Sequence, residues 1–327
     1  MFAPDMDTYG RSLSGAELRP DWHSWQDYRV GLGHVLSRIL PGFSLKKYRS
    51  LKKKKESFEV EPEIEAATAS FLQSRSPWFQ GMVFLRSDKD PESFVNLVVR
   101  QPEDFAFGLS FDCEFVAKCA RSGYLPMAIP ISDTLAIFAP KLHQKRCLLD
   151  FDDLHIPKKT KKRAKRFHAT VDAAFDFCLQ QCCKQHGTHC WFYPRLIQAY
   201  RSIHDRNAKG GVHGVRMHSI EVWSEDGKVV AGEVGYTVGS VYTSLSGFKL
   251  VGNSGSVQLA CVTPILKRCG FTLWDLGMCM EYKTNLGAKD VPRLAFLAKL
   301  RKARDASECF LRLDGAVNAK ELLLEMK

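Results

Sequence analysis

The sequence predicts a mixed α/β (α+β) protein with two folded domains. Three observations support this fold class. The chain has 327 residues with 45% hydrophobic content, which is enough for more than one core. Some segments repeat apolar residues at helical spacing, and others alternate apolar and polar residues as strands do. The two kinds of segment are interspersed along the chain, as in mixed folds.

Residues 1–60 are predicted to be a basic, flexible N-terminal extension. A short amphipathic segment at 26–43 precedes a run rich in lysine at 46–55. Such a run could serve as a nuclear signal, an RNA-binding arm or a membrane-surface anchor. A solvated tail without a partner is the alternative.

Residues 61–133 are predicted to form a small α/β domain. The pattern favours a helix at 63–72 and a strand at 93–100. A second helix is expected after Ser110, because Asp112 can cap a segment with apolar residues at helical spacing and Gly123 can end it.

Residues 134–304 are predicted to form the second domain. Strands are expected on both sides of Pro140, between residues 134 and 150. The next segment has seven basic residues and no acid, a density that suits the phosphates of an RNA backbone. These residues are Lys158, Lys159, Lys161, Lys162, Arg163, Lys165 and Arg166. A solvated charged loop is the alternative.

The remaining elements of this domain alternate between helices and strands. Helices are expected at 171–183, 195–204, 256–268 and 291–304, and strands at 238–245 and 272–276. A hairpin joins 218–223 to 228–234 through an Asp-Gly turn. This order is typical of GNAT-like acyltransferases, whose central sheet splays to admit a donor. Residues 305–327 are left as a C-terminal tail.

Charge and cysteine usage narrow the class of protein. A net charge of +11 favours an anionic partner, with nucleic acid as the first candidate. The 11 cysteines are too irregularly spaced for a secreted disulfide framework, which favours a reducing, cytoplasmic location. No stretch approaches the roughly 20 apolar residues of a membrane span. The N-terminus, with Asp5 and Asp7, does not read as a signal peptide.

Several short sequence motifs, in the same order, resemble those of the leucyl/phenylalanyl-tRNA-protein transferase family. HSIEVW at 218–223 is similar to a segment of that family, and VAG at 230–232 followed by Gly235 resembles its next strand. Asp275, then NLGA at 285–288 and VPR at 291–293, resemble its DCQ...SLGA...IPR block. Motifs that precede this block in the family are similar to LHI at 154–156, KRFH at 165–168 and RSGYLP at 121–126. The resemblance covers about residues 108–302.

The resemblance implies a two-domain enzyme that takes an amino acid from a charged tRNA and adds it to the N-terminal amine of a protein. Bacterial members transfer Leu or Phe to N-terminal Arg or Lys and so mark the acceptor for degradation. It implies no metal and no organic cofactor. The expected partners are aminoacyl-tRNA and proteins with free N-termini, and the expected assembly is a monomer.

The resemblance also implies site residues. Asp275 matches the aspartate that orients the attacking amine, although an aspartate at a strand end can also simply cap a turn. Glu281 is predicted to bind the acceptor. The predicted donor pocket consists of Trp191, Glu233, Tyr242, Ser246, Gly247 and Phe248. Trp191 is expected to stack on the terminal adenine or on the donor.

Four positions depart from the family pattern. Gly277 stands where the family has a glutamine, and Leu245 where it has a glutamate. Glu233 and Gly247 replace methionines of its hydrophobic donor pocket. A buried carboxylate there favours a polar or basic donor side chain, unless Glu233 lies on a solvated face.

Other functions stay open on the sequence alone. The loss of Gln and Glu at 277 and 245 would also suit a binder of aminoacyl-tRNA or of protein N-termini that no longer catalyses transfer. The cysteines and histidines between Cys178 and Cys190 are numerous enough for zinc, but their helical spacing favours core packing. Cys269 or Cys279 with His213 or His218 could make a nucleophile and base. An acyl-CoA transferase is disfavoured, because no clear glycine-rich pyrophosphate loop opens a helix.

Overall fold

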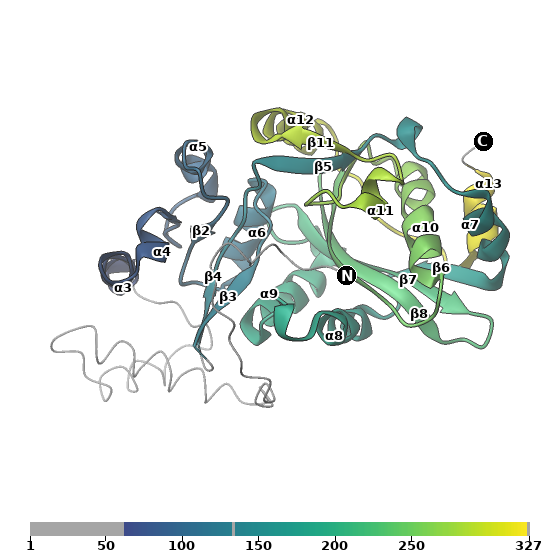
Figure 1. Ribbon diagram of the computed structural model, residues 1–327, viewed down its shortest axis with the longest axis horizontal. Helices are drawn as coiled ribbons and strands as arrows, with labels where there is room; N and C mark the ends of the chain where they lie inside the picture. The colour runs from purple at the N-terminus through teal and green to yellow at the C-terminus, as the bar shows by residue number, and fades with distance from the viewer. Residues whose placement is uncertain (1–61, 133–134, 326–327) are drawn as a thin grey trace.

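The computed structural model describes residues 62–132 and 135–325 (Figure 1). The amphipathic segment at 26–43 and the basic run at 46–55 lie outside the described residues. No helix in the described part of the chain is long and apolar enough to cross a bilayer.

The first part of the chain is a set of short helices around small strands. Its elements are α3 (Pro62–Arg75), α4 (Pro77–Gln80), β1 (Val83–Phe84), η3 (Pro91–Phe94), α5 (Val95–Val99), β2 (Ala106–Phe107), α6 (Cys113–Arg121), β3 (Ala128–Ser132) and β4 (Leu135–Phe138). Asp112 caps α6 as expected, because its carboxylate accepts hydrogen bonds from the backbone of Glu114 and Phe115.

The strand expected at 93–100 is wrong, because this segment is helical. Asp90 caps the start of η3 through the backbone N–H of Glu92, and Pro91 occupies the first turn. Val95 and Val98 of α5 are buried at helical spacing. The β-branched residues that suggested a strand therefore pack from one face of a helix.

The second part is built on one mixed sheet in the order β11-β5-β10-β9-β8-β7-β6-β12. Its strands are β5 (Lys145–Leu149), β6 (Phe167–Val171), β7 (Val215–Ser224), β8 (Val229–Val238), β9 (Val241–Lys249), β10 (Leu273–Asp275), β11 (Lys289–Pro292) and β12 (Val317–Asn318). The hairpin expected at 218–234 is confirmed as β7 and β8.

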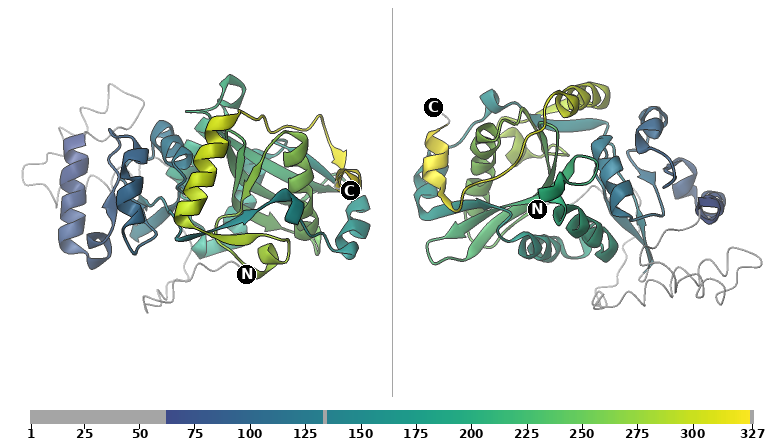
Figure 2. Two further views of the ribbon diagram at one scale, coloured as in Figure 1. Left: turned by 90° about the horizontal axis from the view of Figure 1, so that it is seen from above. Right: turned by 180° about the vertical axis from the view of Figure 1, so that it is seen from behind.

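Helices cover both faces of this sheet (Figures 1 and 2). They are α7 (Lys158–Arg163), α8 (Phe175–His186), α9 (Pro194–His204), α10 (Ser254–Arg268), α11 (Glu281–Thr284), α12 (Arg293–Ala306) and α13 (Ala319–Leu324), with short turns η4 (Phe151–Asp153), η5 (Ala164–Arg166), η6 (Gly187–His189) and η7 (Asn207–Lys209). One core lies under α6, α8, α9 and α12, and a second lies under α10 and α13. The first core also contains Leu85 and Val95, so it joins both parts of the chain.

The expected α/β (α+β) class is therefore confirmed. The helix expected at 171–183 begins later, at Phe175, because Val171 belongs to β6 and Asp172 adopts a left-handed φ of 58° between the two elements. Residues 305–325 contribute β12 at one edge of the sheet and α13 against α10. The proposed domain boundaries stay predictions.

Candidate active site

The sheet opens where its parallel pair diverges. β10 runs parallel to β9 only from Leu273 to Asp275, which lie opposite Val241 and Thr243. β9 continues to Lys249, and in the described structure this continuation has no strand partner on the β10 side. Ser244 to Gly247 are half-buried, whereas the preceding β9 residues are buried. This divergence is called the sheet opening below.

Asp275 ends β10 at the base of the sheet opening, and its carboxylate is fully buried. Arg146 of β5 donates to both carboxylate oxygens, from Nε at 2.8 and 3.0 Å and from Nη2 at 2.8 Å. The Thr243 hydroxyl donates at 3.1 Å and the Gly277 backbone N–H at 2.9 Å. These donors fill the lone-pair directions of the carboxylate. The geometry therefore favours a positioning role over direct proton transfer.

The loop after β10 is held at both ends. Asp275 binds the N–H of Gly277, and the ammonium of Lys283 donates to the carbonyls of Leu276 at 2.5 Å and Met278 at 2.8 Å. Gly277 adopts a φ of 73°, where a glutamine would be strained. The loop therefore follows a path for which glycine is the suitable residue.

Lys283 is a buried lysine that the sequence analysis missed. Burial lowers its pKa, while Cys147, Asp275 and Glu233 act to raise it. The ammonium of Lys283 is therefore within electrostatic range of both Asp275 and Glu233. The short polar segment EYKT at 281–284 has no apolar periodicity, so the sequence does not distinguish Lys283 from a surface lysine.

The predicted donor-pocket residues divide between the two faces of the sheet. Tyr242 belongs to the core under α10, whereas Phe248 belongs to the core beside α8, with Trp191 packed against that core. The carbonyl of Ser246 accepts from the Cys182 thiol of α8 at 3.4 Å. Glu281, predicted to bind the acceptor, is exposed at the start of α11.

Glu233 is buried on the Tyr242 face, so it does not lie on a solvated face. Its Oε1 accepts from the Tyr242 hydroxyl at 2.6 Å and from Ser244 at 2.9 Å. Burial raises its pKa, which these hydrogen bonds partly oppose. Its cross-strand neighbour is Gly247, so the two positions that depart from the family pocket are adjacent.

The seven basic residues of α7 and η5 are all exposed. Arg163 donates to the side chain of Asn253, which precedes α10 and follows the end of β9. Arg166 lies 3.9 Å from Glu225, and both of these side chains are exposed. The basic segment therefore borders the end of the strand that forms one wall of the sheet opening.

The motif HSIEVW, on which part of the family resemblance rests, also holds the sheet together. In HSIEVW, His218 bonds Asp172 at 2.7 Å, and Glu221 binds the hydroxyls of Ser219 and Thr170. Trp223 donates to Thr170 at 2.7 Å. These side chains tie β6 and the residue that follows it to β7.

The Cys–His alternatives find no support in the geometry. His213 pairs with Glu114 at 2.8 Å and His218 with Asp172, so neither is set against a thiol. The described residues include no group of three or more His, Cys, Asp or Glu side chains that could hold a metal. Cys178 and Cys182 are buried in the first core.

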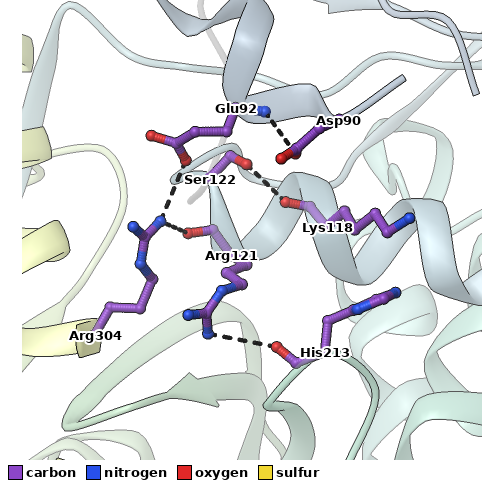
Figure 3. Close-up of a pocket in the computed structure, with 7 residues that line it drawn as sticks. All are labelled: Asp90, Glu92, Lys118, Arg121, Ser122, His213 and Arg304. Atoms are coloured by element: carbon purple, nitrogen blue, oxygen red, sulfur yellow. Dashed lines mark hydrogen bonds and ion pairs between the residues drawn. The ribbon is translucent and has the colours of Figure 1, made fainter.

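Two surface hollows lie elsewhere. In the one in Figure 3, of about 360 Å³, Arg304 pairs with Glu92 at 3.2 Å and Arg121 donates to the His213 carbonyl at 3.4 Å. A second, of about 470 Å³, lies at the start of α8.

Known proteins with similar sequences indicate the class of enzyme to which this chain belongs. The family described as leucyl/phenylalanyl-tRNA protein transferase matches residues 148–301. A leucyl/phenylalanyl-tRNA–protein transferase of Salinibacter ruber is 30% identical over 196 residues, covering 59% of this chain and 80% of the relative. One of Pectobacterium atrosepticum is 31% identical over 187 residues, covering 57% and 74%.

A solved structure is also similar, the C-terminal domain of a putative lysylphosphatidylglycerol synthetase from Agrobacterium fabrum. It is 12% identical and covers 68% of this chain and 79% of that one, with a TM-score of 0.35. This similarity is too distant to bear on function.

The mixed fold and the sequence matches together define an aminoacyltransferase enzyme. The chain belongs to the leucyl/phenylalanyl-tRNA protein transferase family.

Proposed function

We propose that the chain transfers an amino acid from the 3′ ester of a charged tRNA to the N-terminal α-amine of an acceptor protein, at the sheet opening. The observation that carries this proposal is the divergence of β9 and β10 at Asp275, the aspartate of the family motif. The wall residues Ser244 to Gly247 are half-buried, as expected for surface that a substrate covers.

The reaction needs little activation. An N-terminal amine has a pKa of about 7.7–8.0, so a useful fraction is neutral at physiological pH. The amine nitrogen attacks the ester carbon, the amide bond forms, and the ribose hydroxyl leaves with the proton that the nitrogen gives up. Holding the two groups in line supplies several kcal/mol of the rate enhancement.

Asp275 contributes by fixing the start of the loop, and Lys283 by fixing its middle. Together they hold the wall of the sheet opening that faces β9. The exposed carboxylate of Glu281 follows this loop and would pair with a basic acceptor residue. By family analogy, the transferred amino acid marks the acceptor for degradation.

The basic segment at 158–166 supplies the tRNA contact. Its exposed cations suit a phosphate backbone, and the Arg163–Asn253 contact ties the segment to the end of β9. A tRNA lying on α7 would bring its 3′ end toward the sheet opening. Charged tRNA as the donor fits the cytoplasmic location predicted from the sequence.

The donor side chain is polar or basic. Glu233 offers a buried carboxyl, and its neighbour Gly247 has no side chain. A Cβ atom on residue 247 would lie 3.2 Å from the Gly232 carbonyl oxygen and 3.5 Å from the Glu233 Cβ. A basic donor side chain would pair with that carboxyl, whereas Leu or Phe would leave it with its hydrogen bonds from Tyr242 and Ser244 alone. Tyr242 completes the proposed surroundings of the donor on the Glu233 face, whereas Phe248 and Trp191 pack on the opposite face of the sheet and are left out of this pocket.

The test is a donor screen. Purified protein is incubated with tRNA charged in turn with each labelled amino acid and with peptides of varied N-terminal residue. Transfer of a polar or basic amino acid is expected, with E233M/G247M shifting preference toward Leu or Phe by about tenfold, or about 1.4 kcal/mol. Binding of charged tRNA without transfer to any peptide would leave a binding protein and reject the enzyme.

A further inference from the structure

Two cysteines meet beside the base of the sheet opening, on the β5 side of β10. Cys147 lies on β5, and Cys279 lies in the loop after β10. Their sulfur atoms are 2.8 Å apart. A disulfide bond is about 2.05 Å long, so a movement of less than about 1 Å separates the two thiols from a covalent bond.

The backbone holds the two segments together independently of the thiols. The Cys147 N–H donates to the Gly277 carbonyl at 2.7 Å, and the Leu276 N–H donates to the Cys147 carbonyl at 2.8 Å. The approach of the sulfur atoms is therefore fixed by strand-like pairing on both sides of Cys147.

The two thiols differ in access. Cys147 is fully buried, whereas Cys279 is half-buried and is the one that a reagent can reach. Burial raises the pKa of both thiols, and the ammonium of Lys283 opposes this shift in each case. Bond formation at neutral pH is therefore slow and depends on the concentration of oxidant.

We propose that Cys147 and Cys279 are a modification site that closes to a reversible intramolecular disulfide. The thiolate of Cys279 attacks a low-molecular-weight disulfide of the glutathione class and releases one thiol. Cys147 loses its proton to water and attacks the Cys279 sulfur, releasing the second thiol. Two protein thiols are oxidised, and the small disulfide is reduced to two thiols that take up the protons. The bond ties the loop that carries Gly277 to β5.

Cys269 and Cys309 provide a matched control in the same chain. One is half-buried and the other is buried, as in the proposed pair. Their thiols instead donate to backbone carbonyls, Cys269 to Arg312 at 3.3 Å and Cys309 to Gly270 at 3.2 Å.

The experiment treats the folded full chain with glutathione disulfide, followed by acid quenching, alkylation of free thiols and peptide mapping by mass spectrometry. The wild type is expected to lose two of its 11 thiols and yield one peptide pair joining Cys147 to Cys279, reversed by dithiothreitol. C269S is expected to give the same joined pair, and C279S none. Recovery of Cys147 and Cys279 as separate alkylated or glutathionylated residues in the wild type, at the rate of Cys269 and Cys309, would overturn the proposal.

Discussion

Asp275 and Arg146 form the buried ion pair on which the sheet opening rests. Both side chains are essentially inaccessible to solvent, and Arg146 also lies over the ring of Phe296 at 4.5 Å. Removing one partner leaves the other charge buried and unpaired, which costs about 3–5 kcal/mol, whereas replacing both with apolar residues is often neutral. A loss of activity in D275A alone would therefore confound folding with function.

We expect D275A to lower the free energy of unfolding by about 3–5 kcal/mol and R146M/D275L to stay close to the wild type. The double variant should still transfer about 100-fold more slowly, because the Gly277 N–H loses its anchor and the loop shifts. Denaturant unfolding and single-turnover transfer measure the two effects. Full activity in a stable double variant would remove Asp275 from the mechanism.

Glu233 should make stability depend on pH. Its pKa in the folded protein is raised above 4.5 by burial, so its contribution to stability is complete below that value and is lost as pH rises through the folded pKa. E233Q keeps the acceptor oxygen for Tyr242 and Ser244 but cannot ionise. The free energy of unfolding of the wild type minus that of E233Q should therefore fall as pH rises above 4.5. A difference that does not change with pH would show that this carboxyl titrates normally.

Roles for individual residues could be proposed from the sequence only where the residue lies in a motif of the family. The role proposed for Asp275 comes from such a motif, but its partner Arg146 lies 129 positions away, and no local pattern links the two. Lys283 was missed for the same reason. Burial of a charge is decided by tertiary packing, which the local sequence does not report.

At the scale of elements, segments with strong local signals were predicted well. The β7–β8 hairpin follows from alternation and an Asp-Gly turn, and α6 from its Asp112 cap. The segment at 93–100 was mistaken for a strand because its valines suit either element, and the decisive signal was the capped Pro91 turn before it. Strand order was not predictable, because β10 pairs with β5 across more than a hundred residues.

The helix α7 has a testable electrostatic role. K158Q/K159Q should weaken binding of charged tRNA and reduce the slope of log affinity against log salt by about 1 to 2, since each phosphate contact contributes about 0.7 to 0.9. K299Q/K302Q removes two exposed lysines from α12 and should leave the slope unchanged. Equal effects of the two pairs would indicate a diffuse basic surface instead of a binding segment.

At the scale of the whole molecule, one core joins the N-terminal helices to the sheet. Arg293 at the start of α12 reinforces this junction by donating to the Val98 carbonyl at 3.1 Å and to Asp104 at 2.8 Å. The N-terminal part therefore supports α12, which covers the Arg146–Asp275 pair. This shared core could not be predicted from the sequence, because the segments that form it lie far apart along the chain.

The most direct test follows the N-terminus of a defined acceptor peptide by mass spectrometry during incubation with the chain and charged tRNA. A mass gain of one aminoacyl residue at the free α-amine is expected, with no gain on the N-acetylated peptide or with uncharged tRNA plus free amino acid. A gain on the acetylated peptide, or no gain with any charged tRNA under conditions where the protein is folded and binds tRNA, would contradict transfer to the N-terminal amine.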